Sequence, residues 1–174
     1  MWKLSLVALL ALPMHAQKFG VGRAATAEEV KSADIGVLID GTGLPAGKGT
    51  AAEGKDVFSR RCAKCHGANA QGGDEAPLVG GKGTLASAKP LKTIGSFWPH
   101  ATTLFDYINR SMPFNQPGIL TSDQLYSVTA YLLQLNGILQ EGDVLDAKSL
   151  AKVKMPNRDG FVKDPRPDTK KGSK

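Results

Sequence analysis

The sequence has only two cysteines, Cys62 and Cys65, and both lie in one five-residue motif. With no further cysteine, at most one disulfide can form, so a disulfide-rich scaffold is excluded. A structural zinc site of the usual kind would need a fourth ligand, and only His100 at an odd spacing is available to help supply one. Internal repeats are absent, which excludes a repeat architecture.

Long hydrophobic runs are also scarce. Residues 4–12 form the one nearly unbroken apolar run, which is too short to span a bilayer as a permanent helix. Lys3 precedes this run and Pro13-Met14-His15-Ala16 ends it, a pattern typical of an export signal. We expect cleavage after Ala16, a later site near Ala24 or Ala25 being the alternative. The sequence thus predicts a periplasmic bacterial protein that is not inserted in the membrane after cleavage; an uncleaved anchor is the other interpretation.

The positive charge is unevenly distributed. The formal net charge is +6, and residues 154–174 hold seven basic residues against three acidic ones. A basic protein raises the question of nucleic acid binding. Here the basicity lies mostly in a tail, and an exported protein rarely meets nucleic acid, so we expect no nucleic acid partner.

The 20 glycines and 10 prolines predict many turns between a few helices. We expect a signal peptide (residues 1–16), an N-terminal extension (17–50), a core domain (51–140) and a C-terminal extension (141–174) with a disordered end. Capping-box and apolar patterns predict helices beginning near Thr26, over 51–65, over 102–110 and over 122–136. The last helix has Thr121 as its N-cap, Gly137 where a left-handed C-terminal cap is expected, and a buried face that includes Leu125 and Leu135. The predicted fold class is therefore all-α.

The segment Cys62-Ala63-Lys64-Cys65-His66 has the C-x-x-C-H pattern of covalent haem attachment. Residues three apart on a helix share one face, so two thiols can reach two vinyl groups of one porphyrin. The histidine beside the second cysteine is then carried beneath the iron, where it can bind axially. The cofactor expected is one covalently bound haem c.

Two other uses of this motif are weighed against haem. A thioredoxin-like redox pair needs a βαβ setting, whereas the surroundings are helix and loop. A plain disulfide would leave His66 without a role. Haem attachment accounts for all three residues, so it is the interpretation that we keep.

The second axial ligand of the iron has three candidates. Met112 lies between two predicted helices, and Pro113 stiffens its loop. Met155 is also followed by proline but lies in the charged tail, a poor place for a rigid, dry ligand. His100 is the remaining chemical option. We favour Met112, and ordinary packing is its alternative role.

Four accessory residues carry weaker expectations. Phe58 and Tyr131 are expected to meet where two helices cross, with Gly54 allowing a close approach. Trp98 and Arg110 are expected to lie along the haem or to bond a propionate, or else to be a half-buried aromatic and a solvated arginine.

A helix with C-x-x-C-H, glycine-rich loops, a methionine loop and a C-terminal helix resembles the class I cytochrome c family over about residues 51–137. Segments 19–26, 96–107, 110–114 and 154–161 are further similar to cytochrome subunits of bacterial periplasmic sulfite dehydrogenase and of the Sox sulfur dehydrogenase. The resemblance implies a class I cytochrome c fold, with haem bound by Cys62, Cys65, His66 and, through the Met-Pro-Phe motif, Met112. Some Sox relatives carry a second haem site, whereas this chain has one motif, which favours the sulfite-dehydrogenase-like branch or a free-standing carrier.

The resemblance implies a function without catalysis of its own. A molybdenum-cofactor subunit would oxidise a sulfur compound, and this chain would take single electrons and pass them to a downstream cytochrome or oxidase. The alternatives are a haem enzyme or gas-binding protein with an open iron site, a general carrier for another dehydrogenase, and a subunit in which haem only stabilises the fold. The basic segment 154–161 is expected to dock against a partner, with Phe161 as an apolar anchor and Arg158 as a charged contact; a solubilising tail is the alternative.

Overall fold

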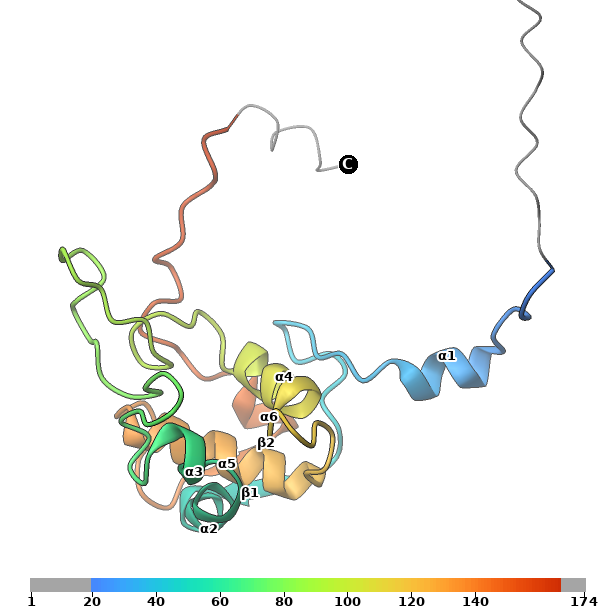
Figure 1. Ribbon diagram of the computed structural model, residues 1–174, viewed down its shortest axis with the longest axis horizontal. Helices are drawn as coiled ribbons and strands as arrows, with labels where there is room; N and C mark the ends of the chain where they lie inside the picture. The colour runs from blue at the N-terminus through green and yellow to red at the C-terminus, as the bar shows by residue number, and fades with distance from the viewer. Residues whose placement is uncertain (1–19, 167–174) are drawn as a thin grey trace, which may run out of the picture. The chain divides into compact units, whose positions relative to one another are not determined.

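The computed structural model describes residues 20–166 (Figure 1). The predicted signal peptide and the predicted disordered end, over residues 167–174, lie outside the described residues. The chain divides into two compact units, one ending at Asp34 and the other beginning at Ile35. The elements in chain order are α1 (Ala27–Ala33), β1 (Lys48–Thr50), α2 (Ala51–Arg61), α3 (Ala63–His66), α4 (Ala101–Ser111), α5 (Ser122–Leu135), β2 (Val144–Asp146) and α6 (Ala147–Leu150).

Within residues 20–34, the described part of the N-terminal unit, the one helix is α1. The Thr26 side chain accepts a hydrogen bond from the Glu29 N–H while the Glu29 carboxylate accepts one from the Thr26 N–H, so the predicted capping box is confirmed. The same carboxylate pairs with the Arg23 guanidinium. Hydrogen bonds from Arg23 and from the Thr26 N–H lower the pKa of Glu29 to about 2. All residues from Gly20 to Asp34 are exposed to solvent.

The body is organised by the crossing of α2 and α5. A Cβ placed on Gly54 of α2 would lie 1.9 Å from the Ser127 carbonyl oxygen of α5, so only glycine permits this approach. One turn further along, the rings of Phe58 and Tyr131 lie with their centroids 5.4 Å apart. The predicted meeting of Phe58 and Tyr131 beside Gly54 is confirmed.

The predicted continuous helix over residues 51–65 is wrong in one detail. Helix α2 ends at Arg61 and α3 begins at Ala63. Between them Cys62 has a φ of −122°, outside helical geometry, although its N–H still donates to the Phe58 carbonyl. The break redirects the chain just where the haem-attachment motif begins.

Helices α4 and α5 complete the core. The rings of Phe105 and Tyr126 pack with centroids 4.8 Å apart. The predicted N-cap at Thr121 is confirmed, and so is the left-handed Gly137 after the helix, with a φ of +67°. Leu125 is buried as expected. Leu135 is 37% exposed, because it is the last residue of α5 and the helix ends there.

Both flanks of the helical body are packed on it. The Val37 N–H donates to the buried Asp106 carboxylate of α4, and the Tyr126 hydroxyl donates to the Pro45 carbonyl. Strand β1 pairs antiparallel with β2, Lys48 opposite Asp146. After α6, the side chain of Met155 is buried in the core at 3% exposure. Segments on both sides of residues 51–140 therefore add to one core.

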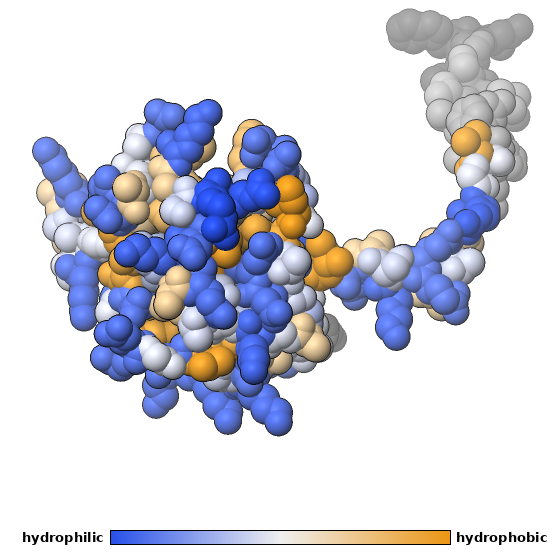
Figure 2. All heavy atoms as spheres, turned by 90° about the horizontal axis from the view of Figure 1, so that it is seen from below, coloured by the Kyte–Doolittle hydropathy of each residue, from blue (hydrophilic) through white to orange (hydrophobic). Residues whose placement is uncertain are grey.

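None of the helices within residues 20–166 is long and apolar enough to cross a bilayer. Figure 2 shows a face that is mostly hydrophilic, with hydrophobic residues in separate small areas. Some exposed large hydrophobic side chains, such as Phe114 and Ile119, are single in the chain, whereas Leu38-Ile39 and Phe161-Val162 are adjacent pairs.

Candidate functional site

The C-x-x-C-H segment forms the junction of α2 and α3. Cys62 is the residue between the two helices, and Cys65 and His66 form the last half-turn of α3. The N–H groups of Cys65 and His66 both donate to the Cys62 carbonyl oxygen, which fixes the two cysteines on the same short turn. Cys62 is half-buried against the core, while Cys65 is exposed. This geometry presents two thiols and one imidazole together.

The two thiols are free and are not joined as a disulfide. Burial raises the pKa of Cys62 to about 11, and the nearby charge of Cys65 adds to the effect. A thioredoxin-like pair requires the opposite, a cysteine whose pKa is lowered. Within residues 20–166, no group of three or more His, Cys, Asp and Glu side chains is placed to hold a metal ion, so the zinc alternative has no ligand set there.

His66 is oriented by the loop that follows it. Its Nδ1 atom lies 3.1 Å from the Ala76 carbonyl oxygen. A carbonyl oxygen can only accept, so this contact assigns the proton to Nδ1 and leaves the lone pair of Nε2 free for a metal. A histidine bound to iron through Nε2 needs this tautomer.

The loop reaches His66 because it is folded tightly against α3. The Gly72 N–H donates to the His66 carbonyl, and the Glu75 N–H donates to the Cys65 carbonyl. Gly67 has a φ of +79°, and a Cβ on it would lie 2.4 Å from the Gly72 carbonyl oxygen. Glycine at this position therefore permits both the turn and the close packing that bring the Ala76 carbonyl to the imidazole.

Met112 is the C-cap that directly follows α4, and it begins the loop toward α5. Its N–H closes the helix by donating to the Ile108 carbonyl, and its side chain is half-buried against the core. His100 is the residue before α4 and is also half-buried. Met155 is almost completely buried, so the expectation that the tail would leave it in a wet, mobile place is wrong.

The neighbours of these residues are mostly apolar. Leu78, Val79 and Trp98 are half-buried and pack against the same core as Cys62 and Met112. The ring of Trp98 meets the ring of Tyr107 edge to face at 5.6 Å. Arg110 donates through Nε and Nη2 to the Asp106 carboxylate, so its guanidinium already has an anionic partner in the chain. The arginine is therefore not simply solvated.

Asp106 is a buried charged residue that sequence reasoning missed. Burial raises its pKa, but hydrogen bonds from Arg110 and from the Val37 N–H outweigh this and the net pKa is below its usual value. The only sequence signal was the i, i+4 spacing of an aspartate and an arginine. The Ala76 carbonyl was also missed, because a backbone acceptor leaves no trace in residue identity.

These residues fit covalent haem. Two free thiols, an imidazole with an available Nε2 and a thioether match the donor types that hold haem c. Half-buried apolar side chains next to them suit the faces of a porphyrin. Nothing in this donor set favours a hard metal ion, which would prefer carboxylate oxygens.

Comparison with known proteins agrees with this chemistry. The family described as Cytochrome c matches residues 51–136. A chain in the crystal structure of the sulfane dehydrogenase SoxCD from Paracoccus pantotrophus superposes with a TM-score of 0.79 and is 43% identical. That match covers 88% of this chain and 76% of the other. The chain belongs to the cytochrome c family. It is a c-type electron-transfer cytochrome with the class I fold and covalently bound haem c.

A second relative of the cytochrome is an oxidase subunit. The cbb3-type cytochrome c oxidase subunit CcoP of Azospirillum sp. (strain B510) is 37% identical over 112 residues. The match takes in 59% of the cytochrome but only 35% of that subunit, so the cytochrome spans about a third of the length of this relative. The likeness is that of one domain to part of a longer protein.

Proposed function

We propose that Cys62 and Cys65 would hold haem c through thioether links and that His66 Nε2 and Met112 Sδ would bind its iron. The support is the geometry of the C-x-x-C-H turn and of the imidazole held through Nδ1 by the Ala76 carbonyl. Haem c, when bound, exchanges one electron at a time between its ferric and ferrous states. The surrounding residues hold the imidazole in one tautomer and, through Leu78, Val79 and Trp98, reduce access of water.

Met112 is preferred to Met155 on burial and position. Met112 ends a helix, is half-buried and precedes a proline, so its thioether is available beside the core. Met155 is 3% exposed and already packed in the hydrophobic cluster, and the Arg158 N–H donates to its carbonyl. It has the environment of a packing residue.

The electron donor that we propose is a molybdenum-cofactor dehydrogenase acting on a reduced sulfur compound in the bacterial periplasm. One observation carries this step. The likeness to the SoxCD chain covers 88% of the cytochrome, far more than the haem domain at residues 51–136 that cytochromes of many kinds share. A haem domain that many cytochromes share does not explain the similarity outside residues 51–136.

The donor's chemistry sets the stoichiometry of the reaction. Oxidation of sulfite or of a sulfane sulfur releases electrons in pairs, whereas one haem accepts one. Two successive transfers through the same site are therefore needed for each pair, with reoxidation by a downstream cytochrome or oxidase between them. Sulfite and sulfane sulfur remain the two candidate substrates of the donor, and the experiment separates them.

The test is anaerobic reduction of the purified holo-cytochrome by the purified dehydrogenase. Absorbance of the reduced haem is followed with sulfite, with a sulfane-sulfur donor and with no substrate. We expect substrate-dependent reduction of two cytochromes per sulfur atom oxidised by two electrons. Reduction at the same slow rate with and without each substrate would show that a sulfur-compound dehydrogenase is not the donor.

A further inference from the structure

The described part of the N-terminal unit, residues 20–34, forms a defined helix but buries none of its side chains. Helix α1 is seven residues long and none of them is buried. Helices this short are marginal in water, because few hydrogen bonds offset the cost of nucleation. Local interactions hold α1 together, yet they leave its apolar side chains in water.

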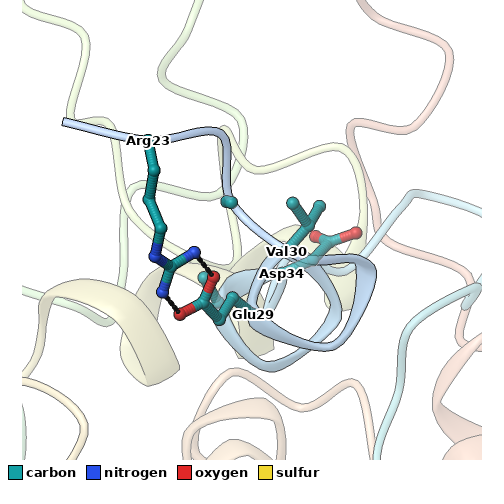
Figure 3. Close-up of a pocket in the computed structure, with 6 residues that line it drawn as sticks. Arg23, Glu29, Val30 and Asp34 are labelled. Carbon is teal, nitrogen blue, oxygen red and sulfur yellow. Dashed lines mark hydrogen bonds and ion pairs between the residues drawn. The ribbon is translucent and has the colours of Figure 1, made fainter. Parts of the chain in front are cut away.

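Two valines of this unit are exposed to solvent, Val30 on α1 and Val21 in the segment before it. Val30 is 58% exposed and Val21 is 91% exposed. Ala25, Val30 and Ala33 line an open concave surface between the segment before the helix and the helix itself. Figure 3 shows Arg23 reaching from that segment to Glu29 on α1, with Val30, the next residue of the helix, and Asp34, its C-cap, close to each other.

The ion pair makes the concavity a preformed feature. The Arg23 guanidinium donates to the Glu29 carboxylate and also to the Ala24 carbonyl, so it ties the segment before the helix to α1. The Glu29 carboxylate is fixed in turn by the Thr26 N–H. A segment held in one shape before association loses less conformational entropy when it binds.

The likeness to the SoxCD chain includes part of this unit. The match to the SoxCD chain covers 88% of the cytochrome, which is more than residues 35–174 alone can supply, so it extends into the N-terminal unit. Part of this unit is therefore shared with a chain of a sulfane dehydrogenase. It lies outside residues 51–136, so holding haem does not explain why it is shared.

We propose that residues 20–34 form a preshaped arm that docks into a shallow apolar groove on the catalytic subunit of the partner dehydrogenase. This inference rests on the proposed function. The two exposed valines supply the apolar contact, and the Arg23–Glu29 pair holds the arm in the docking shape. Docking by the arm adds affinity for the donor without altering the haem site.

The experiment uses the full holo-cytochrome and the purified molybdenum-cofactor subunit of the same organism's sulfur-compound dehydrogenase. The variant carries Val21→Asp and Val30→Asp. Its matched control is Val144→Asp, the same change at a valine that is 49% exposed on the body. We expect the arm variant to raise the Kd for the donor about tenfold or more, as loss of a buried apolar contact does, and the control to leave it unchanged. The haem spectrum and reduction potential should be the same in all three proteins.

Hydrogen exchange of the amides of residues 20–34 provides a second measurement. Protection should appear when the donor is added and should be absent without it. If protection rises with the concentration of the cytochrome alone, the arm binds a second copy of the cytochrome. If the arm is protected at every concentration without the donor, it packs on its own chain. Either outcome overturns the proposal. If the donor binds and reduces all three proteins equally, the docking proposal is also overturned. If the donor fails to reduce the unaltered cytochrome, the proposed function is overturned instead.

Discussion

The Nδ1 atom of His66 lies 3.1 Å from the carbonyl oxygen of Ala76, a residue ten positions later in the chain. The contact depends on a loop whose backbone returns to α3 at Gly72 and Glu75. The orientation of the proposed iron ligand is therefore set by the fold of a glycine-rich loop.

Gly67→Ala should disturb this loop. The new Cβ would meet the Gly72 carbonyl oxygen at 2.4 Å while also forcing alanine to a positive φ, so we expect a loss of about 1–3 kcal/mol in the free energy of unfolding. The imidazole should lose its fixed orientation, seen as a changed His66 NMR signal and a shifted reduction potential. Gly83→Ala is the control, because Gly83 has a φ of +78° but no atom within 4 Å of an added Cβ. If both variants lower the free energy of unfolding equally, the loss comes from the positive φ alone and not from contact with the Gly72 carbonyl oxygen.

Removing both cysteines should abolish covalent attachment. With Cys62→Ser and Cys65→Ser together, no thiol remains in the chain to form a thioether, and Cys62→Ser alone should leave at most one link. The measurement is haem staining after denaturing electrophoresis. Haem that still migrates with the denatured double variant would refute the proposed attachment sites.

Met112→Ala should change the properties of the haem, whereas Met155→Ala should change only the stability of the fold. Loss of Met112 should remove the weak near-infrared sulfur-to-iron band of the ferric protein, let carbon monoxide bind and lower the reduction potential. Loss of the buried Met155 should leave these properties intact and cost about 2–5 kcal/mol of stability through a cavity. The reverse pattern would place the ligand in the C-terminal segment. Carbon monoxide binding by the unaltered protein would instead support an open iron site.

Gly54→Ala should separate α2 from α5. The added Cβ would overlap the Ser127 carbonyl oxygen, so the helices must move apart, and we expect a loss of about 3 kcal/mol in the free energy of unfolding. Thermal and denaturant unfolding measure it. The exposed Ala52 of the same helix gives the comparison: Ala52→Gly should cost only about 1 kcal/mol, the difference in helix propensity. Similar costs for both changes would mean that the helix crossing tolerates expansion.

Asp106 should make stability depend on pH in the acid range. Its pKa is lower in the folded chain than its usual value, so its contribution is fully present above that usual value and is lost as the pH falls through the folded pKa. The free-energy difference between the unaltered protein and Asp106→Asn should therefore shrink as the pH falls from about 6 to about 3. A difference that stays constant over this range would show that Asp106 does not titrate differently in the folded state.

Local signals in the sequence predicted local structure well. The capping boxes at Thr26 and Thr121 and the left-handed Gly137 are confirmed because each depends on residues within one helical turn. The meeting of Phe58 and Tyr131 could also be predicted, since both lie on regular helices whose buried faces are visible in the apolar spacing.

Features that depend on distant residues could not be predicted. The break at Cys62 requires a φ that nothing in its neighbours' identity demands. The burial of Met155 is set by the C-terminal segment's packing on the loop before α4, where the Asn157 side chain donates to the Phe97 carbonyl. The exposed Phe161, expected to anchor a partner, packs edge to face on Phe97 of its own chain with centroids 5.3 Å apart. Phe161 is still 55% exposed, so its role as an anchor for a partner stays a prediction.

The pairing of β1 with β2 has a mechanical consequence. Because Lys48 lies opposite Asp146 and Thr50 opposite Val144, the chain enters and leaves this ladder at the same end. A force that pulls the two flanks apart would open its hydrogen bonds one after another, as a zipper opens, instead of loading them together in shear. The ladder should therefore yield at low force, before the packing of α2 against α5 is strained.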